Sequence, residues 1–351
     1  MKFIQRCCGL IGILAVTITG AHAAKEPKPL FQSHEIIKIR IDAPFKKIVR
    51  KASSSKDPHA ATITLEGAAT ESLPIELSAR GNSRRNKKLC SFPPLRVAFT
   101  DKPGDASLFD GQKRLKLVTH CRKSASYQQF YVREYLAYRI FSELSPTSLK
   151  VRMAEIDYVD SESGKHVVSK LGFFIEDTDD AAKRNGLKEI DVADIDPGQL
   201  SKTHAGQYSI MQYLISNFDW SMHDGRDEVD CCHNTKLMGA EKDATTELIP
   251  VGYDFDYSGL VDTPYAVAPP SLSLRSVRER YYRGLCRHND EARIALADII
   301  AKKEQIFAVI DSVDALERKS RIKARKFIEI FFRKTETPKK IERNIFSTCR
   351  S

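Results

Sequence analysis

Residues 248–259, LIPVGYDFDYSG, carry the pattern from which the fold and the site are predicted. An apolar run ends at Gly252, and Asp254 and Asp256 follow it two residues apart. This pattern predicts a buried strand that delivers two carboxylates at its end. Carboxylate oxygens are hard donors that suit Mg²⁺ or Mn²⁺, so both residues are candidate metal ligands. The alternative is a surface turn in which an aspartate only caps the backbone.

Upstream of this motif, two polar groups follow an amphipathic stretch that predicts a helix over 208–218. Asp219 comes directly after this helix, and Asn234 precedes a short predicted strand. Phosphotransferases have the same order of features along the chain, namely a helix, an Asp, an Asn, a hairpin and a second Asp. There the first Asp orients the acceptor hydroxyl, while the Asn and the later Asp hold the metal. The alternatives are that Asp219 caps a turn and that His233 is a packed histidine.

A third group of candidates lies in the first half of the chain. Arg80 begins a glycine turn, RGNS, that continues into the basic run RRNKK at 84–88. Such a turn can hold phosphates through backbone N–H groups and charge, although a plain basic hairpin tip is the alternative. Lys116 lies in a predicted strand and Glu134 in the next predicted helix. A Lys–Glu pair of this kind holds a phosphate-contacting ammonium in kinases.

Hydrophobic periodicity predicts an α+β protein with two lobes. Strands are expected at 36–41, 61–65, 73–80, 95–99, 114–118, 151–158 and 166–175, with a helix over 127–144. Short strands at 236–238 and 248–252 and helices over 208–218, 291–310 and 322–332 complete the prediction. The first half is thus expected to be β-rich with one long helix, and the second half to be mainly helical.

The chain resembles the CotH-type spore-coat kinase family, which is similar to atypical secreted protein kinases. The features that carry this resemblance are the RGNS turn, the helix around 133–144, Asp219, Asn234 and the DFD motif, in this order. The resemblance covers roughly residues 73–259. It implies a bilobal protein-kinase-like fold, ATP with Mg²⁺ or Mn²⁺ as cofactor, and secreted or envelope proteins as substrates. Asp219 would then be catalytic, Asn234 and Asp254 would hold metal, and Asp256 would support them. Arg80, Lys116 and Glu134 would contact or position the nucleotide.

Two departures from the kinase pattern keep other functions open. The interval between Asp219 and Asn234 is far longer than the four-residue gap of ordinary kinases, and there is no glycine-rich nucleotide loop. These departures favour a catalytically inactive scaffold or binding protein of the cell envelope as the alternative. A metal-dependent hydrolase or glycosyltransferase that uses Asp254 and Asp256 is a third hypothesis.

The N-terminal sequence predicts export. Lys2 and Arg6 precede an apolar stretch, and Ala21-His22-Ala23 forms a small-residue cleavage site. The predicted organisation is a signal peptide at 1–23, a linker at 24–34, a β-rich lobe at 35–178, a helical lobe with the metal-site hairpin at 179–317, and a basic tail at 318–351. An uncleaved membrane anchor is the alternative. A secreted or periplasmic location is expected, with no membrane span in the mature chain.

The cysteines agree with an oxidising compartment. Without Cys7 and Cys8, an even set of six remains, at 90, 121, 231, 232, 286 and 349. We expect disulfides, and we expect the adjacent Cys231 and Cys232 to pair with two distant partners rather than with each other. A zinc site at Cys231, Cys232 and His233 is an alternative that lacks a second ligand cluster.

Composition limits the remaining classes. In 351 residues, 42% are hydrophobic and 29% are charged, which excludes collagen-like, low-complexity and wholly disordered proteins. The net charge is +10, but from 318 to 350 twelve Lys and Arg face only three acids, so the body of the protein is near neutral. A basic solvated helix is therefore expected at the C-terminal end, and no nucleic-acid partner.

Overall fold

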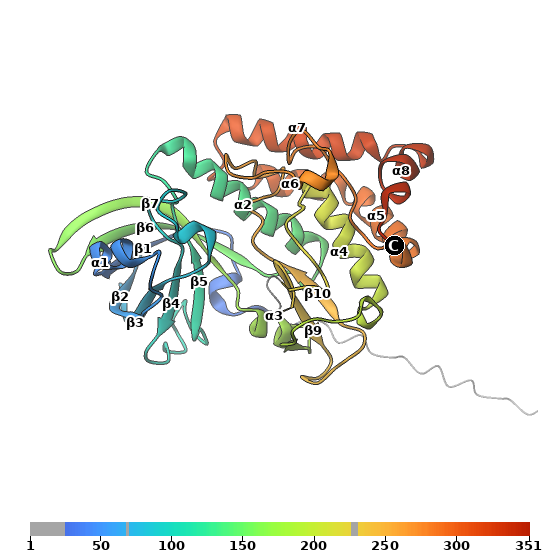
Figure 1. The fold of residues 1–351 in the computed structure, drawn as a ribbon. Coiled ribbons are helices and arrows are strands. Elements are labelled where there is room, and N and C mark those ends of the chain that lie inside the picture. Colours follow the sequence, from blue (N-terminus) through green and yellow to red (C-terminus); the bar gives the residue numbers. More distant parts are fainter. Residues whose placement is uncertain (1–24, 68–69, 226–230) are drawn as a thin grey trace, which may run out of the picture.

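A computed structural model describes residues 25–67, 70–225 and 231–351 (Figure 1). The predicted signal peptide and its cleavage site lie outside the described residues. Among the described residues, no helix has both the length and the apolar character needed to cross a membrane.

Seven strands form a closed β-barrel in the first half of the chain. They follow one another around the barrel in the order β1-β2-β3-β4-β5-β7-β6, and a parallel pairing of β1 with β6 closes the circle. The other pairings are antiparallel. The strands are β1 (Ile37–Ala43), β2 (His59–Glu66), β3 (Glu71–Ala79), β4 (Leu95–Phe99), β5 (Arg114–Val118), β6 (Val151–Asp160) and β7 (Lys165–Ile175).

Alternation along the strands fills the barrel. In β1, for example, Ile37, Ile39 and Ile41 are buried while the residues between them are mostly exposed, as a strand with one face on a core requires. These side chains belong to one apolar cluster that also holds Phe174 and, from helix α1 (Phe45–Lys51), Phe45. Side chains from both the strands and α1 thus form one packed apolar cluster in this half of the chain.

The rest of the chain is built from helices and a small second sheet, which has the strand order β10-β9-β8. The helices are α2 (Ala125–Leu144), α3 (Thr178–Arg184), α4 (Lys202–Ile215), α5 (Asn289–Ala301), α6 (Lys303–Asp311), α7 (Arg318–Lys334) and α8 (Pro338–Asn344). The strands are β8 (Lys188–Ile190), β9 (Thr235–Gly239) and β10 (Ile249–Gly252). Short 3-10 helices span Pro29–Phe31, Ser83–Arg85, Pro197–Gln199, Pro270–Leu272, Cys286–His288 and Phe346–Thr348.

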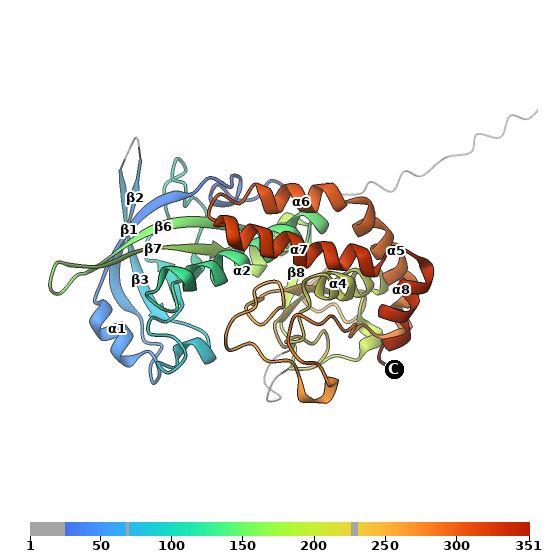
Figure 2. The ribbon, with the colours of Figure 1, turned by 90° about the horizontal axis from the view of Figure 1, so that it is seen from above.

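Helix α2 joins the barrel to the other helices (Figure 2). Its residues are buried on nearly every side, and its Tyr138 packs edge-on against Phe255 at 4.6 Å between ring centres. These two rings belong to a second apolar cluster, distinct from that of the barrel interior, which also contains Phe173 of β7 and Phe331 of α7. One continuous core therefore runs from the barrel strands through α2 into the helices.

The predicted bilobal, protein-kinase-like fold with a mainly helical C-terminal lobe is wrong. The β-strands close into a seven-stranded barrel because β1 pairs with the distant β6. The sequence pattern locates strands but does not say which strands pair across long separations. The predicted helix over 291–310 is also two helices, α5 and α6, with a break at Lys302.

The basic C-terminal segment is folded onto the core. In α7, Phe327, Ile328 and Phe331 are buried, and the guanidinium of Arg280 lies 4.0 Å from the ring centre of Phe327. The Lys and Arg residues of α7 lie mainly on its outer face. This helix is amphipathic because its apolar residues recur at helical spacing.

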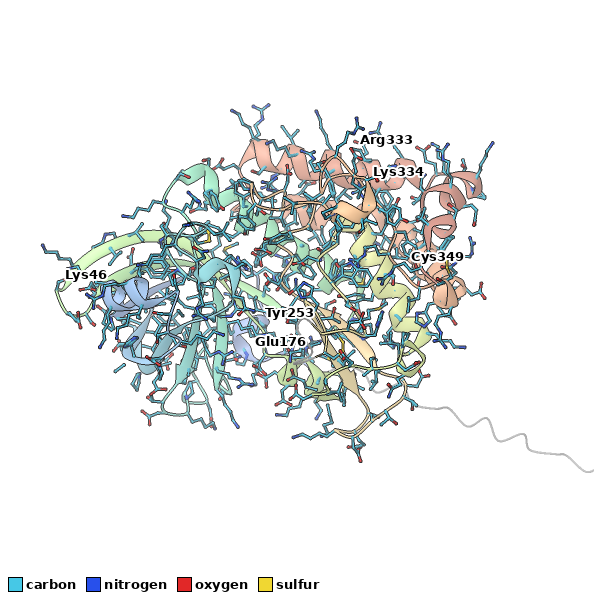
Figure 3. All side chains as sticks on the ribbon, viewed as in Figure 1. Lys46, Glu176, Tyr253, Arg333, Lys334 and Cys349 are labelled. Atoms are coloured by element: carbon cyan, nitrogen blue, oxygen red, sulfur yellow. A yellow bond between two sulfur atoms is a disulfide. The ribbon has the colours of Figure 1, made fainter. Side chains whose placement is uncertain are left out.

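Three disulfides are present among the described residues. Cys90 pairs with Cys121, and Cys286 pairs with Cys349 near the C-terminus (Figure 3). Cys231 pairs with its neighbour Cys232, so the prediction that these two cysteines have distant partners is wrong. The adjacent pair also means that neither cysteine offers a thiolate to zinc.

The Cys286–Cys349 link closes the longer loop, with a sequence separation of 63 against 31 for Cys90–Cys121. We expect the Cys286→Ala/Cys349→Ala variant to lose about 2–4 kcal/mol of unfolding free energy, because the crosslink restricts the unfolded chain. Urea unfolding measures this loss. Cys231→Ala/Cys232→Ala is the control, since its disulfide closes no loop. An equal loss in both variants would contradict the loop-closure explanation.

Candidate functional site

The β9–β10 hairpin brings Asn234 and Asp254 together. Gly252 at the end of β10 pairs with Thr235 at the start of β9, and the amide of Tyr253 donates to the carbonyl of Asn234 at 3.1 Å. Asn234 and Asp254 both have left-handed backbone conformations, with φ of 51° and 59°. Asn and Asp tolerate this conformation better than other non-glycine residues. The hairpin thus ends in two polar residues on adjacent, sharply turned backbones.

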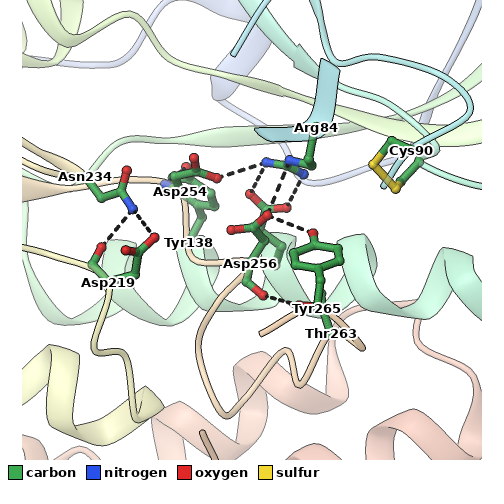
Figure 4. A network of polar contacts seen from close by, with 11 residues as sticks. Arg84, Cys90, Tyr138, Asp219, Asn234, Asp254, Asp256, Thr263 and Tyr265 are labelled. Carbon is green, nitrogen blue, oxygen red and sulfur yellow. Dashed lines mark hydrogen bonds and ion pairs between the residues drawn. A yellow bond between two sulfur atoms is a disulfide. The ribbon is translucent and has the colours of Figure 1, made fainter. Parts of the chain in front are cut away.

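Asp219 lies against the same hairpin end, after helix α4. The side-chain amide of Asn234 donates to the backbone carbonyl of Asp219 at 2.8 Å and to its carboxylate Oδ2 at 2.9 Å (Figure 4). Nε2 of His233 lies 2.6 Å from Oδ1 of the same carboxylate. The Asp219 amide donates to Oδ1 of Asn217 at 3.1 Å. Asp219 is therefore held at both its backbone and its carboxylate, in a fixed orientation.

Arg84 connects the barrel side of the site to three carboxylates (Figure 4). It lies in the 3-10 helix Ser83–Arg85, and its guanidinium nitrogens are 3.1 Å from Glu134, 2.9 Å from Asp254 and 3.4 Å from Asp256. The Arg84 side chain is only 10% exposed and that of Glu134 only 1%. The predicted Lys116–Glu134 pair is wrong, because the cation that contacts Glu134 is Arg84.

Burial and charge shift the ionisation of this cluster. Burial alone lowers the pKa of Arg84, but Glu134, Asp256 and Asp254 outweigh it and hold that pKa well above its usual range. Burial raises the pKa of Asp256, and the neighbouring Asp254 raises it further. Burial likewise raises the pKa of Glu134. Three carboxylates around one guanidinium carry more negative than positive charge, so the cluster favours an added cation or proton.

Asp256 is buried more deeply than its neighbour in the motif. Its side chain is 5% exposed, against 36% for Asp254. The hydroxyl of Tyr265 donates to Asp256 Oδ2 at 2.8 Å, and Thr263 donates to its backbone carbonyl. These contacts make Asp256 a support for Arg84, while Asp254 is the more accessible of the two carboxylates.

Two further cations lie on the barrel side. Arg80 follows β3, and burial lowers its pKa even though the charge of Asp254 acts in the opposite direction. Lys116 lies in the middle of β5, and its Nζ is 5.0 Å from the ring centre of Tyr253. Burial, with a smaller contribution from Arg80, lowers the pKa of Lys116 to about 8. The site thus has cations on the barrel and carboxylates on the hairpin.

The donor set fits a divalent cation shared with phosphate oxygens. Asp219, Asn234 and Asp254 supply hard oxygen atoms, and Mg²⁺ usually takes one or two protein carboxylates and completes its shell with phosphate and water. Among residues 25–67, 70–225 and 231–351, no group of three or more His, Cys, Asp or Glu side chains is arranged to hold a metal without other ligands. Asp219, Asn234 and Asp254 could therefore hold a metal only together with oxygen atoms from another molecule.

Sequence reasoning missed the residues that fix this geometry. In the sequence, Arg84 is one cation in a basic run of five residues, and Tyr138 is one residue of a predicted helix. In the structure, Tyr138 accepts a hydrogen bond from the Asp254 amide at 2.8 Å. Tyr265 lies in a loop without any recognisable motif. These roles depend on contacts between segments that are distant in sequence, and a local sequence motif does not contain such contacts.

Comparison with known proteins gives no assignment. No protein-family model matches the chain, and no curated protein matches it.

Removing Arg84 tests the buried cluster. We expect Arg84→Met to cost about 3–5 kcal/mol of unfolding free energy, because buried carboxylates lose their counter-ion. Adding Glu134→Gln should recover about 1–3 kcal/mol of that loss. Arg85→Met is the control, since the partners of the Arg85 guanidinium among the described residues are backbone carbonyls. Chemical denaturation of the wild type, the Arg84→Met and Glu134→Gln single variants, the double variant and the control measures these values. Strict additivity of the two site substitutions would show that the pair is not coupled.

The lowered pKa of Lys116 predicts a pH effect on stability. Between about pH 8, the folded value, and 10.5, the ordinary value, the unfolded chain binds more protons at this residue than the folded protein. Stability due to Lys116 therefore rises as pH increases through this window. We expect the unfolding free energy of the wild type, relative to Lys116→Met, to increase from pH 8 to 10. A constant difference across these pH values would contradict the lowered pKa.

Proposed function

We propose that this chain is an exported CotH-like phosphotransferase that uses ATP and a divalent metal to phosphorylate secreted or envelope proteins. The observation that carries the proposal is the convergence of Asp219, Asn234 and Asp254 at one hairpin end, facing cations of the barrel. Phosphoryl transfer needs hard oxygen donors, positive charge for the phosphates and a carboxylate that orients the acceptor hydroxyl. The site contains all three kinds of group.

In this proposal Asp219 acts on the acceptor. His233 and Asn234 hold its carboxylate in place, so that it can accept the proton of a substrate hydroxyl without having to reorient. Asp219 remains partly exposed, at 24% of its side chain, and is thus accessible to a protein substrate.

Asn234 and Asp254 would hold the metal, which when bound neutralises charge on the transferred phosphate. Arg84 fixes Asp254 through Oδ1, and Tyr138 accepts the hydrogen bond of its backbone amide. Glu134 acts one step further away, because it holds Arg84. Lys116 and Arg80 supply positive charge for the phosphates on the barrel side.

Export is supported by the disulfides. Cys90–Cys121 and Cys286–Cys349 join residues that are distant in sequence, and such crosslinks persist in oxidising compartments. This agrees with the basic and apolar N-terminal residues of the sequence. We therefore propose a secreted or periplasmic location.

One observation favours a second function, that of a catalytically silent binding protein. Arg84 already bonds to Asp254 and Asp256, so a guanidinium neutralises part of the charge that would attract a metal. The outer face of α7 carries Lys319, Lys323 and Lys326 in exposed positions, which would suit an acidic envelope partner.

Two substitutions distinguish these functions. With Asp254→Asn, we expect the Mn²⁺-dependent rise in melting temperature caused by ATP to fall strongly, because the charge that attracts the metal is lost. With Asp219→Asn, ATP and Mn²⁺ should still stabilise the protein, while phosphoryl transfer should fall by about 10²-fold or more. Thermal shift and transfer of labelled phosphate measure the two effects.

The matched control is Asp243→Asn, an exposed carboxylate in the turn of the same β9–β10 hairpin. It should behave as wild type in both assays. If Asp254→Asn also responds to ATP and Mn²⁺ as wild type does, the metal role is wrong and the binding protein is the better explanation.

A further inference from the structure

A second concentration of positive charge lines a cavity of about 190 Å³ between the barrel and the small second sheet. Arg96 of β4, Arg114 and Lys116 of β5, and Lys236 of β9 contribute cationic side chains to its wall. Tyr253, beside Lys116, lies where the barrel meets this sheet (Figure 3). The cavity is thus bounded by strands, which are rigid supports for a binding site.

The strand register places like charges opposite each other. Arg96 and Lys116 are direct partners across the antiparallel β4–β5 pair, so their side chains leave the sheet on the same face. Arg114 lies two residues from Lys116 and shares that face. Like charges directly opposite each other on neighbouring strands are destabilising. Water screens this repulsion at the exposed Arg96, so its energetic cost falls mainly on the more buried Lys116.

The acids of the cavity do not neutralise this pair. Asp177 lies 3.4 Å from Arg114, and Glu189 lies 3.4 Å from Lys236. For Arg96 and Lys116, no carboxylate of the described residues lies within 4.0 Å. Arg96 and Lys116 thus face the cavity with no carboxylate of the described residues at ion-pair distance.

Size and polarity restrict the ligand. Pockets for drug-sized ligands have volumes of about 300–1,000 Å³, so this cavity suits a compact group better than a whole nucleotide. Leu115 is the only aliphatic residue among those that line it. A purine base needs apolar walls, whereas a small oxyanion needs the charged donors that are present here.

We propose that this cavity binds a compact, multiply charged oxyanion group, a phosphate or a sulfate, through Arg96 and Lys116. The ligand supplies the negative charge that is missing beside Arg96 and Lys116, which the register of β4 and β5 places opposite each other. The cavity shares Lys116 with the phosphotransfer site proposed above, but binding needs neither a metal nor Asp254. The metal-free test with Arg96→Gln and Asp254→Asn therefore distinguishes failure of this proposal from failure of the phosphotransfer.

The test uses pyrophosphate, inorganic phosphate and sulfate as probes, each added to the full-length protein in the presence of a chelator. We expect at least one of them to raise the melting temperature to a saturating value. Arg96→Gln should weaken that binding by about tenfold, the loss expected for one charge-assisted hydrogen bond. The same substitution should leave the ligand-free melting temperature unchanged or raise it, because it removes like-charge repulsion.

Two control variants distinguish binding in this cavity from a general effect of positive charge and from binding at the phosphotransfer site. Lys38→Gln removes an exposed cation from β1 and should bind the probe as wild type does. Asp254→Asn should also bind it as wild type does. The tightest probe identifies the group as phosphate or sulfate.

Three results would overturn the proposal. They are the absence of saturable binding of every probe to the wild type, equal binding by Arg96→Gln, and equal weakening by Lys38→Gln. Binding of ATP without metal is measured as a further test. If ATP binds more than tenfold tighter than pyrophosphate and Arg96→Gln leaves that binding unchanged, a base is recognised and the cavity is not an oxyanion site.

Discussion

The ion pairs of Arg84 hold the functional region together. One nearly buried guanidinium contacts Glu134 in α2 and both Asp254 and Asp256 after β10, three carboxylates on segments far apart in sequence. Removing a buried charge from its partners costs far more than a surface ion pair is worth, so these contacts constrain how the barrel meets the hairpin. The position of Asp254 therefore depends on a residue that precedes it by 170 positions.

The two halves of the site have different mechanical supports. Asp254 depends on Arg84 and on Tyr138, which belongs to the nearly fully buried helix α2. Asp219 depends on His233 and Asn234, which belong to the end of the β9–β10 hairpin. The hydrogen bond from Tyr253 to Asn234 connects the two supports. Preorganisation of this kind matters for phosphoryl transfer because catalysis there is mostly positioning and charge stabilisation.

Local features of the fold could be predicted from the sequence, and long-range ones could not. Strands β4 and β5 have the predicted bounds, because alternation and turn residues are local properties. The parallel pairing of β1 with β6, which closes the barrel, leaves no local pattern. The break at Lys302 has neither Pro nor Gly to indicate it, and the Cys231–Cys232 pair contradicts the rule of distant partners. In the site, Asp254 stood out as a motif, whereas Arg84 is distinguished only by what it contacts.

Charge is distributed unevenly across the region between barrel and hairpin. On the barrel side, no carboxylate in the described part of the chain pairs with Lys116 or Arg96, while Glu134, Asp254 and Asp256 share Arg84 on the other side. The strands fix the cations and α2 fixes Glu134, so the two groups of charges do not move together to neutralise each other. Arg96 is exposed, whereas Lys116 is more buried, so the lack of a carboxylate partner bears mainly on Lys116. A phosphorylated ligand that carries a metal would bring charge of both signs, and for this reason the proposed function matches a region with cations on the barrel and carboxylates on the hairpin.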